Sequence, residues 1–193
     1  MVETKILPQA PVLVGERVLD DRATRFGKQI VERDFRMPNG EVLPILCVIN
    51  RGMDPVIVFA LTEHETVFLV HQFRFGINGW ILELPGGGPK PGQTCEETAR
   101  TELLEEVGVE AGTIQVIGEL MAFNPMLENI RFNAVLATGC RVVRAPTHDR
   151  TEIMTVMEVS VVKFRQMLKN GEMTDAKTVA TGYLALDCLG QLE

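Results

Sequence analysis

Serine is nearly absent from this chain. Ser160 is the only serine among 193 residues, and no glycine-flanked nucleophile motif surrounds it. A hydrolase that attacks through a serine hydroxyl is therefore excluded. Glycine-rich nucleotide loops are also missing, because neither the Gly-x-Gly-x-x-Gly spacing nor a Gly-Lys-Ser/Thr sequence occurs. Rossmann-type and P-loop nucleotide binding thus have no support in the sequence.

Metal-binding patterns of cysteine and histidine are lacking as well. The four cysteines and three histidines are dispersed, with no Cys-x-x-Cys pair and no histidine at zinc-ligand spacing. We therefore expect reduced, mostly structural thiols and no metal site built from histidine. The residues concerned are Cys47, Cys95, Cys140, Cys188, His64, His71 and His148.

Basic side chains and long apolar runs are scarce too. The chain has 19 lysines and arginines against 26 aspartates and glutamates, so a broad basic surface for nucleic acid is not expected. No stretch approaches the apolar length of a membrane span, and residues 1–8 lack the basic-then-apolar pattern of a signal peptide. The sequence predicts a cytoplasmic protein that binds neither nucleic acid nor membrane.

Turn signals and apolar patterning predict two parts of unequal size. Residues 28–37 and 41–50 flank Pro38-Asn39-Gly40, a strong hairpin signal, so residues 1–50 are expected to form an antiparallel β subdomain. Residues 51–193 are expected to form a mixed α/β domain. Its expected strands cover residues 56–61, 67–70, 114–123, 132–138 and 153–159, and its last two helices cover residues 161–169 and about 175–188.

A loop of glycine and proline, residues 85–92, precedes the best-defined helix of the sequence. Thr94 lies three residues before Glu97, which is a capping-box arrangement, and the following residues are compatible with a helix up to Val107. Gly108 then supplies a stop signal. Because chemistry often resides on such loops, the junction of loop and helix is the first place to look for a functional site.

Three carboxylates cluster at the end of this helix. With each residue advancing about 100°, Glu102, Glu105 and Glu106 are expected on one face, toward the preceding loop. Like charges so close repel unless a cation joins them, and hard oxygen ligands suit Mg²⁺ or Mn²⁺. A solvated acidic helix face is the alternative for these residues taken alone. The apolar residues expected to dock the neighbouring face on a sheet are Ala99, Leu103 and Val107.

The surroundings of this helix resemble the Nudix hydrolase family, whose motif reads Gly, five residues, Glu, seven residues, Arg-Glu-U-x-Glu-Glu-x-Gly-U, with U aliphatic. A weaker likeness to ADP-ribose pyrophosphatases covers most of the chain and includes 72–74 (Gln-Phe-Arg) and 83–87 (Glu-Leu-Pro-Gly-Gly). The resemblance implies an α/β (α+β) fold, a mixed-sheet α/β/α sandwich with an N-terminal antiparallel β subdomain. The motif positions in register are Gly87, Glu102, Leu103, Glu105, Glu106, Gly108 and Val109.

Two positions depart from that motif. Gln93 replaces its first Glu and Thr101 replaces its Arg, while Arg100 lies one residue too early and about 100° away around the helix. In the family these two positions support each other behind the metal ligands. Losing both together removes a matched charge pair without leaving either charge unpaired, so we expect weakened or retuned metal positioning and not an abolished site.

The resemblance also implies roles for individual residues. Glu102 and Glu106 would be the principal ligands of Mg²⁺, or of Mn²⁺, with Glu105 assisting and the Gly86 carbonyl completing the shell. Glu105 and Glu106 would therefore also serve catalysis, and Glu152 would be the general base, with Asp149 as second choice and solvated turn residues as the alternative for both. The expected substrate contacts are Arg74, Trp80, Asn124 and Arg131, and Phe75 is a further stacking candidate. A surface ion pair is the alternative for Arg74, and a place in the core is the alternative for the two aromatic residues.

ADP-ribose is the expected substrate, with AMP and ribose 5-phosphate as products. The segment 124–131 resembles an Asn-Pro loop of some Nudix relatives and differs from the Ser-Asp-Glu loop of other ADP-ribose enzymes. Another nucleotide sugar, such as GDP-mannose, is therefore an open alternative, as is a non-catalytic nucleotide-binding module. The resemblance further implies a homodimer formed through the N-terminal β segment, although that segment might equally pack on its own domain.

Overall fold

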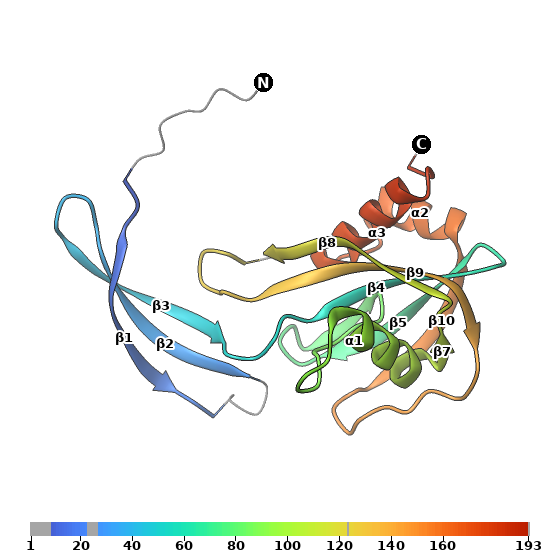
Figure 1. Cartoon of the computed structure of the whole chain (residues 1–193), viewed down its shortest axis with the longest axis horizontal. Coiled ribbons are helices and arrows are strands. Elements are labelled where there is room, and N and C mark those ends of the chain that lie inside the picture. The colour runs from blue at the N-terminus through green and yellow to red at the C-terminus, as the bar shows by residue number, and fades with distance from the viewer. Residues whose placement is uncertain (1–8, 23–26, 123, 193) are drawn as a thin grey trace. The chain divides into compact units, whose positions relative to one another are not determined.

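A computed structural model describes residues 9–22, 27–122 and 124–192, and the chain divides into two units (Figure 1). The smaller unit consists of Met1–Met53 together with Asn124–Ile130. The larger unit consists of Asp54–Phe123 and Arg131–Glu193. Phe123, the last residue of one expected strand, lies outside the described residues.

The smaller unit is a three-stranded antiparallel sheet in the order β1-β2-β3. β1 covers Val12–Asp20, β2 covers Lys28–Arg36 and β3 covers Val42–Asn50. β2 and β3 pair without a break from Lys28 opposite Asn50 to Arg36 opposite Val42, and Gly40 takes a φ of 86° in the turn. The hairpin predicted from the Asn-Gly signal is confirmed.

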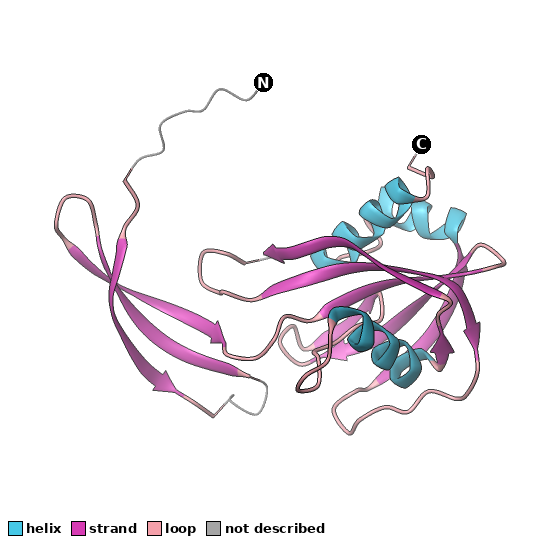
Figure 2. Ribbon diagram, in the orientation of Figure 1, coloured by secondary structure: helices cyan, strands magenta, loops and turns pink. Residues whose placement is uncertain are grey.

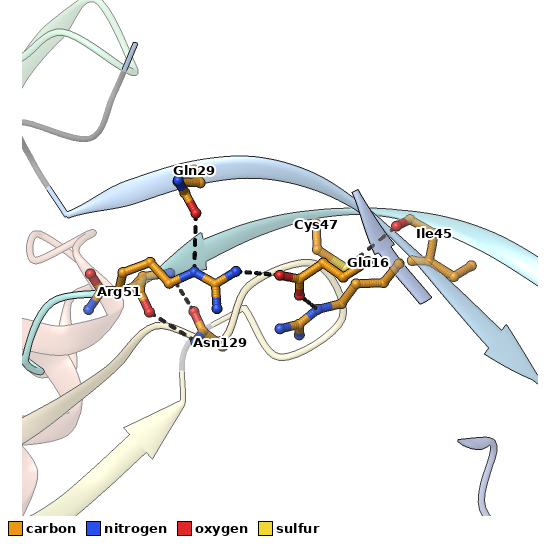
Figure 3. Close-up of polar contacts among 8 residues, drawn as sticks. Glu16, Gln29, Ile45, Cys47, Arg51 and Asn129 are labelled. Atoms are coloured by element: carbon orange, nitrogen blue, oxygen red, sulfur yellow. Dashed lines mark hydrogen bonds and ion pairs between the residues drawn. The ribbon is translucent and has the colours of Figure 1, made fainter. Parts of the chain in front are cut away.

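Residues 124–130 belong to the smaller unit, although they connect two strands of the larger unit, β8 (Thr113–Ala122) and β9 (Arg131–Val142). The Val48 N–H donates to the Leu127 carbonyl at 2.8 Å. Asn129 bonds the backbone of Asn50 twice, because its Oδ1 accepts from the Asn50 N–H at 2.6 Å and its Nδ2 donates to the Asn50 carbonyl at 3.2 Å (Figure 3). The free edge of β3 is thereby partly covered.

Several charged side chains of the smaller unit are paired with opposite charges. Glu16 accepts from Arg33 Nε at 2.7 Å and from the Arg51 guanidinium, which also donates to Gln29 at 3.1 Å (Figure 3). These arginine hydrogen bonds, that of Arg33 first, lower the pKa of Glu16. The carboxylate is thus held in its charged form by the fold.

Apolar side chains of this unit, in contrast, are largely in contact with solvent. The buried apolar residues on its three strands are Val31, Cys47 and Ile49. Three strands cannot bury both faces of a sheet by themselves, and so large apolar side chains remain exposed. These are Val12, Leu13, Val14, Val18, Leu19, Ile30, Val42 and Leu46.

The larger unit is built on a mixed sheet with the strand order β10-β5-β4-β9-β7, with β6 pairing β5 and β8 pairing β9. β4 and β9 run parallel, and the other pairs are antiparallel. The strands are β4 Val56–Thr62, β5 Thr66–Arg74, β6 Gly79–Glu83, β7 Val109–Glu110, β8 Thr113–Ala122, β9 Arg131–Val142 and β10 Met154–Ser160.

Helices cover both faces of this sheet (Figure 2). On one face, α2 (Val161–Lys169) and α3 (Ala176–Cys188) pack through Phe164 and Leu186 on alternate residues of β4 and β5. On the other face, α1 (Cys95–Glu102) and the following turn pack through Ala99 and Leu103. The predicted α/β/α sandwich with a mixed sheet is confirmed, as are the Ser160 and Asp175 starts of the last two helices.

The carboxylate helix itself differs from the sequence prediction. Thr94 and Glu97 form the expected capping box, but regular α-helix ends at Glu102, and Leu103–Val107 form a π-helical turn that closes at Gly108 with φ 70°. The regular spacing of 100° per residue therefore does not extend to Glu105 and Glu106. Ala99, Leu103 and Val107 are buried against the sheet, as predicted.

The helices in the described part of the chain are all too short or too polar to cross a membrane.

Candidate active site

The glycine loop is held against strand β4. The Val58 N–H donates to the Pro85 carbonyl and the Val56 N–H to the Gly87 carbonyl, both at 2.9 Å. A Cβ on Gly86 would come within 2.1 Å of the Val56 carbonyl oxygen, so only glycine fits there. The Gly86 carbonyl, between the two bonded ones, has no hydrogen-bond partner among the described residues.

Glu106 and Glu102 both face this loop. Glu106 is 4% exposed, and its Oε2 accepts from the Gly86 N–H at 2.8 Å. Glu102 lies so close to Gly87 that a Cβ on that glycine would come within 2.7 Å of the carboxylate. The loop and the helix therefore bring two carboxylates together beside an open backbone carbonyl.

Burial sets the electrostatics of these two groups. It raises the pKa of Glu106 to about 8, against the lowering effect of the Gly86 hydrogen bond, and Glu102 and Glu152 add repulsion. It also raises the pKa of Glu102 to about 7, with repulsion from Glu105 and Glu152. Charged forms of both residues are thus costly in the protein alone, and a nearby cation would relieve that cost.

Glu105 has a different environment, because it is half-exposed and forms an ion pair with Lys90. Lys90 Nζ lies 2.6 Å from Glu105 Oε1, and this hydrogen bond raises the pKa of the lysine. The expectation that the three carboxylates share one face is therefore met only in part. Glu102 and Glu106 point toward the glycine loop, whereas Glu105 is engaged by a cation of the same loop.

Residues 143–152 line the end of the π-helical turn. The Thr147 N–H donates to the Glu105 carbonyl at 2.7 Å, and His148 Nε2 lies 2.9 Å from the Glu106 carbonyl. Arg144 also donates to the Leu104 carbonyl at 3.2 Å. These contacts satisfy carbonyls that a helix end leaves without partners, so the segment is fixed to the carboxylate turn.

Glu152, the expected general base, follows directly in this segment. Its Oε2 accepts from the Asp149 N–H at 2.7 Å, and its own N–H donates to the Asp149 carbonyl at 2.9 Å. The carboxylate is close enough to raise the pKa values of both Glu102 and Glu106. The fold thus brings Glu152 from about fifty residues away into the electrostatic range of the helix carboxylates.

Arg74 approaches the same carboxylates from the end of β5. Its guanidinium lies 2.6 Å from Glu83 Oε2, and Glu83 is 4% exposed in its side chain. Lys177 Nζ lies 3.9 Å from the other Glu83 oxygen. Arg74 also lowers the pKa of Glu106, which places the guanidinium within electrostatic range of that carboxylate.

The other expected substrate contacts are dispersed. Trp80 is 52% exposed, and its ring packs on His71 and Phe73 with centroids 5.1 and 5.8 Å away. His71 and Phe73 alternate along β5 with residues that face α1, so Trp80 lies on the opposite face of the sheet from the carboxylates. The exposed Phe75 contacts Phe73 at 5.5 Å.

Asn124 and Arg131 lie at the two ends of the β8–β9 connection. Asn124 belongs to the smaller unit and donates to Glu128 at 3.2 Å. Arg131 belongs to the larger unit, where its N–H donates to Asp54 at 3.2 Å and its side chain to the Leu120 carbonyl at 3.4 Å. Neither residue has a described contact with Glu102, Glu105 or Glu106.

The donor set at the glycine loop fits a hard divalent cation. No three His, Cys, Asp or Glu side chains in the described ranges lie close enough to hold a metal by themselves. Two carboxylates of raised pKa and an unpartnered carbonyl nevertheless offer three oxygens, and Mg²⁺ takes few protein ligands and keeps several waters. Glu102, Glu106 and Gly86 are the residues that would hold it.

Sequence reasoning missed several residues of this site. No role was assigned to Lys90, Glu83 or Lys177, and His148 was considered only as a possible metal ligand. The basic side chain in the glycine–proline loop was the only local signal for Lys90. The other three are placed by contacts between segments that are distant in the chain, which no local pattern records.

Comparison with known proteins gives a consistent result. The family model described as the NUDIX domain matches residues 53–181. An ADP-ribose pyrophosphatase of Bacillus subtilis (strain 168) is 31% identical over 157 residues, covering 79% of this chain and 82% of the relative. A GDP-mannose pyrophosphatase of Citrobacter koseri is 28% identical over 187 residues, covering 90% of this chain and 93% of the relative.

A solved structure shares the fold. The crystal structure of an ADP compounds hydrolase superposes with a TM-score of 0.81 and covers 97% of this chain and 100% of that chain. Its sequence identity to this chain is 18%, so the likeness bears on the architecture alone.

Proposed function

Because the chain belongs to the NUDIX domain family, we propose that it hydrolyses ADP-ribose to AMP and ribose 5-phosphate with Mg²⁺ or Mn²⁺ as cofactor. The family and the relatives make it a pyrophosphate hydrolase of the ADP-ribose and nucleotide-sugar type. The choice of ADP-ribose and of the metal is the part that we propose. Support for ADP-ribose comes from the 31% identity to an ADP-ribose pyrophosphatase over most of both chains.

The single observation that carries the chemistry is the pair Glu102 and Glu106 on the glycine loop. Both carboxylates lie against glycines that accept no side chain, and burial raises the pKa values of both. Such an arrangement is costly for folding alone, because like charges and burial both disfavour it. This cost is offset if a divalent cation and an anionic phosphate occupy the site together.

The metal, when bound, would polarise the phosphoryl oxygens and acidify an attacking water. The protein's own residues do the rest. Arg74, oriented by buried Glu83, would donate its guanidinium hydrogen bonds to a phosphate oxygen. Glu152 would accept a proton from the water as its oxygen attacks phosphorus and the bridging P–O bond breaks. Asp149, which is hydrogen-bonded to Glu152, remains the second choice of base.

GDP-mannose is the alternative substrate that a specific observation favours. The alignment with the GDP-mannose pyrophosphatase covers 90% of this chain, more than that with the ADP-ribose pyrophosphatase, which covers 79%. Base and sugar contacts decide between these substrates, whereas the metal chemistry is shared. A panel of nucleoside diphosphate sugars, compared by kcat/KM, separates the two.

The proposed assembly is a homodimer formed through the N-terminal sheet. β1 pairs only with β2 among the described strands, and Val12 and Leu46 are each 57% exposed. An open strand edge next to apolar side chains is a surface that proteins cover, here by a second copy. Light scattering after size exclusion is expected to give twice the mass of one chain, and a monomer mass would contradict the proposal.

The first experiment is to incubate the protein with ADP-ribose and Mg²⁺ and to measure AMP, with Glu106→Gln as the control. Glutamine keeps an oxygen that can accept from the Gly86 N–H but lacks the charge. Metal-dependent AMP from the wild type and not from the variant is expected. Metal binding without turnover of any nucleoside diphosphate sugar would instead leave the non-catalytic binding module as the function.

A further inference from the structure

Gln93 and Thr101, the two positions that depart from the Nudix motif, contact each other. Gln93 Nε2 donates to Thr101 Oγ1 at 2.9 Å. Gln93 Oε1 accepts from the Lys90 N–H at 2.8 Å, and the Gln93 N–H donates to the Lys90 carbonyl at 3.0 Å. Thr101 in turn donates its hydroxyl proton to the Glu97 carbonyl at 2.9 Å. A continuous chain of hydrogen bonds therefore joins the glycine–proline loop to helix α1.

Few types of side chain can complete this series of hydrogen bonds. The Lys90 N–H can only donate, so the Gln93 oxygen must face it and the Gln93 nitrogen must face Thr101. Thr101 then has to accept and donate at once, which a hydroxyl does and a methyl or a carboxylate does not. Gln93 and Thr101 are therefore matched to each other by their donor and acceptor atoms.

The Gln93–Thr101 pair lies where it can affect the positions of the carboxylates. Thr101 precedes Glu102 directly, and Lys90, on the loop side, carries the ammonium that contacts Glu105. Between them lies the close approach of Gly87 to the Glu102 carboxylate, which leaves no room for a methyl group. A small displacement of the loop along the helix would therefore change the distance from the Gly86 carbonyl to Glu102 and Glu106.

Arg100 does not take part in this contact. Its guanidinium donates to Glu96 at 2.9 Å and to the Ala111 carbonyl at 2.7 Å, on the side of the helix toward β7. The arginine that lies one residue before the motif position is thus engaged elsewhere. The link at these two motif positions therefore consists of two uncharged side chains.

We propose that the Gln93–Thr101 hydrogen bond positions the glycine loop against the carboxylate helix for metal binding, in place of the Glu and Arg that the motif carries. The inference rests on the proposed function. It makes Gln93 and Thr101 positioning residues that act through Gly86, Glu102 and Glu106. Each of the two departures from the motif then compensates for the other, and the site is kept intact.

The test compares Thr101→Val with Thr101→Ser. Valine has the shape of threonine but cannot accept from Gln93, whereas serine keeps the hydroxyl. Mn²⁺ affinity, measured by calorimetry without substrate, is expected to fall about tenfold or more in Thr101→Val, the range found when partners behind metal ligands are removed. Thr101→Ser is expected to recover most of it, and kcat is expected to fall with the metal affinity while the melting temperature changes little.

A second pair of variants tests the matching directly. Gln93→Glu alone cannot donate to Thr101 and is expected to weaken Mn²⁺ binding, whereas Gln93→Glu with Thr101→Arg restores a donor–acceptor pair and is expected to recover it. Hydrogen exchange of residues 86–93 should be faster in both Thr101→Val and Gln93→Glu than in wild type.

The outcomes separate this inference from the proposed function. Equal Mn²⁺ affinity and kcat in wild type, Thr101→Val and Thr101→Ser would overturn the positioning role and leave the hydrolase unaffected. A double variant no better than Gln93→Glu would also overturn it. A wild type that neither binds Mn²⁺ nor hydrolyses a nucleotide sugar would overturn the proposed function, and the positioning role would fall with it.

Discussion

Glu106 in the larger unit and Glu16 in the smaller unit are both glutamates within folded structure, but their surroundings are opposite. Glu16 lies between two arginines, and these hydrogen bonds lower its pKa. Glu106 is buried next to Glu102 and has a backbone N–H as its hydrogen-bond donor, and burial raises its pKa to about 8. The first carboxylate is held in its charged form by the fold, whereas the charged form of the second is costly and a bound cation would lower that cost.

This difference separates charges that stabilise structure from charges that prepare a site. In the smaller unit, arginines on neighbouring strands neutralise carboxylates, and apolar side chains remain exposed. In the larger unit, apolar side chains are buried on both faces of the sheet, and burial raises the pKa values of the two carboxylates beside the glycine loop. We therefore propose different partners for the two units, a second copy of the chain for the smaller one and a metal with an anionic substrate for the larger one.

The largest effect is expected from neutralising the two glutamates in turn. Glu106→Gln should lower kcat/KM about 100- to 1000-fold, the cost of losing one electrostatic contribution to the transition state. Glu16→Gln should leave kcat/KM at the wild-type value. Steady-state assays with ADP-ribose and Mg²⁺ measure kcat/KM for both variants. Equal losses in the two would contradict the distinction between a structural carboxylate and a carboxylate of the site.

A smaller effect is expected from adding one methyl group to the glycine loop. Gly87→Ala would place its Cβ 2.7 Å from the Glu102 carboxylate, so Glu102 or the loop must shift. We expect kcat/KM to fall about 10- to 100-fold, as for other disturbed metal ligands. Gly88→Ala is the matched control, because a Cβ there meets nothing within 4 Å. Similar losses in both variants would show that the whole loop, and not the contact with Glu102, is sensitive.

The pH dependence of stability should also differ between the two carboxylates. The pKa of Glu106 is raised to about 8 and that of Glu102 to about 7, so the folded protein retains protons that the unfolded chain releases near its ordinary value of 4.5. Their contribution to stability is therefore present below pH 4.5 and is lost as the pH rises to 8. Glu16, with its lowered pKa, contributes in the opposite sense and loses its contribution in acid.

Urea unfolding in the presence of a chelator, at several values between pH 5 and pH 8.5, measures this dependence. The free energy of unfolding should fall with pH by up to about 1.4 kcal/mol per unit for each titrating group. Glu106→Gln should flatten the curve, and Mg²⁺ should stabilise the protein most at high pH. Parallel curves for wild type and Glu106→Gln would show that Glu106 titrates normally.

The sequence predicted those parts of the fold that depend on local patterns. The Asn39-Gly40 turn, the capping box of Thr94 and the burial of Leu103 follow from turn geometry, capping chemistry and periodicity, and all three are observed. The π-helical turn was not predicted. Thr147 and His148 bond its carbonyls although His148 lies 42 residues from its partner Glu106, and no local pattern records such contacts. The assignment of residues 124–130 to the smaller unit rests on equally distant contacts with Val48 and Asn50.

The candidate site was predictable in its carboxylates and not in their partners. The motif spacing located Glu102, Glu105 and Glu106, but spacing carries no information on which of them a lysine engages or which lie under a glycine loop. The partnership of Gln93 with Thr101 spans eight residues and was registered in the sequence only as two departures from a pattern. In the structure, a donor atom of Gln93 faces an acceptor atom of Thr101, so the two departures from the motif form a contact.

The smallest effect is expected on the stability of the N-terminal sheet. Glu16→Gln leaves Arg33 and Arg51 near each other without the carboxylate that both contact. Since the pair is partly exposed to solvent, the free energy of unfolding should fall by about 1 kcal/mol or less, and less still at high salt. Urea unfolding at low and high salt measures the loss. A loss of several kcal/mol that salt does not reduce would mean that the Glu16 network is buried in the working assembly, as it would be if a second copy covered this sheet.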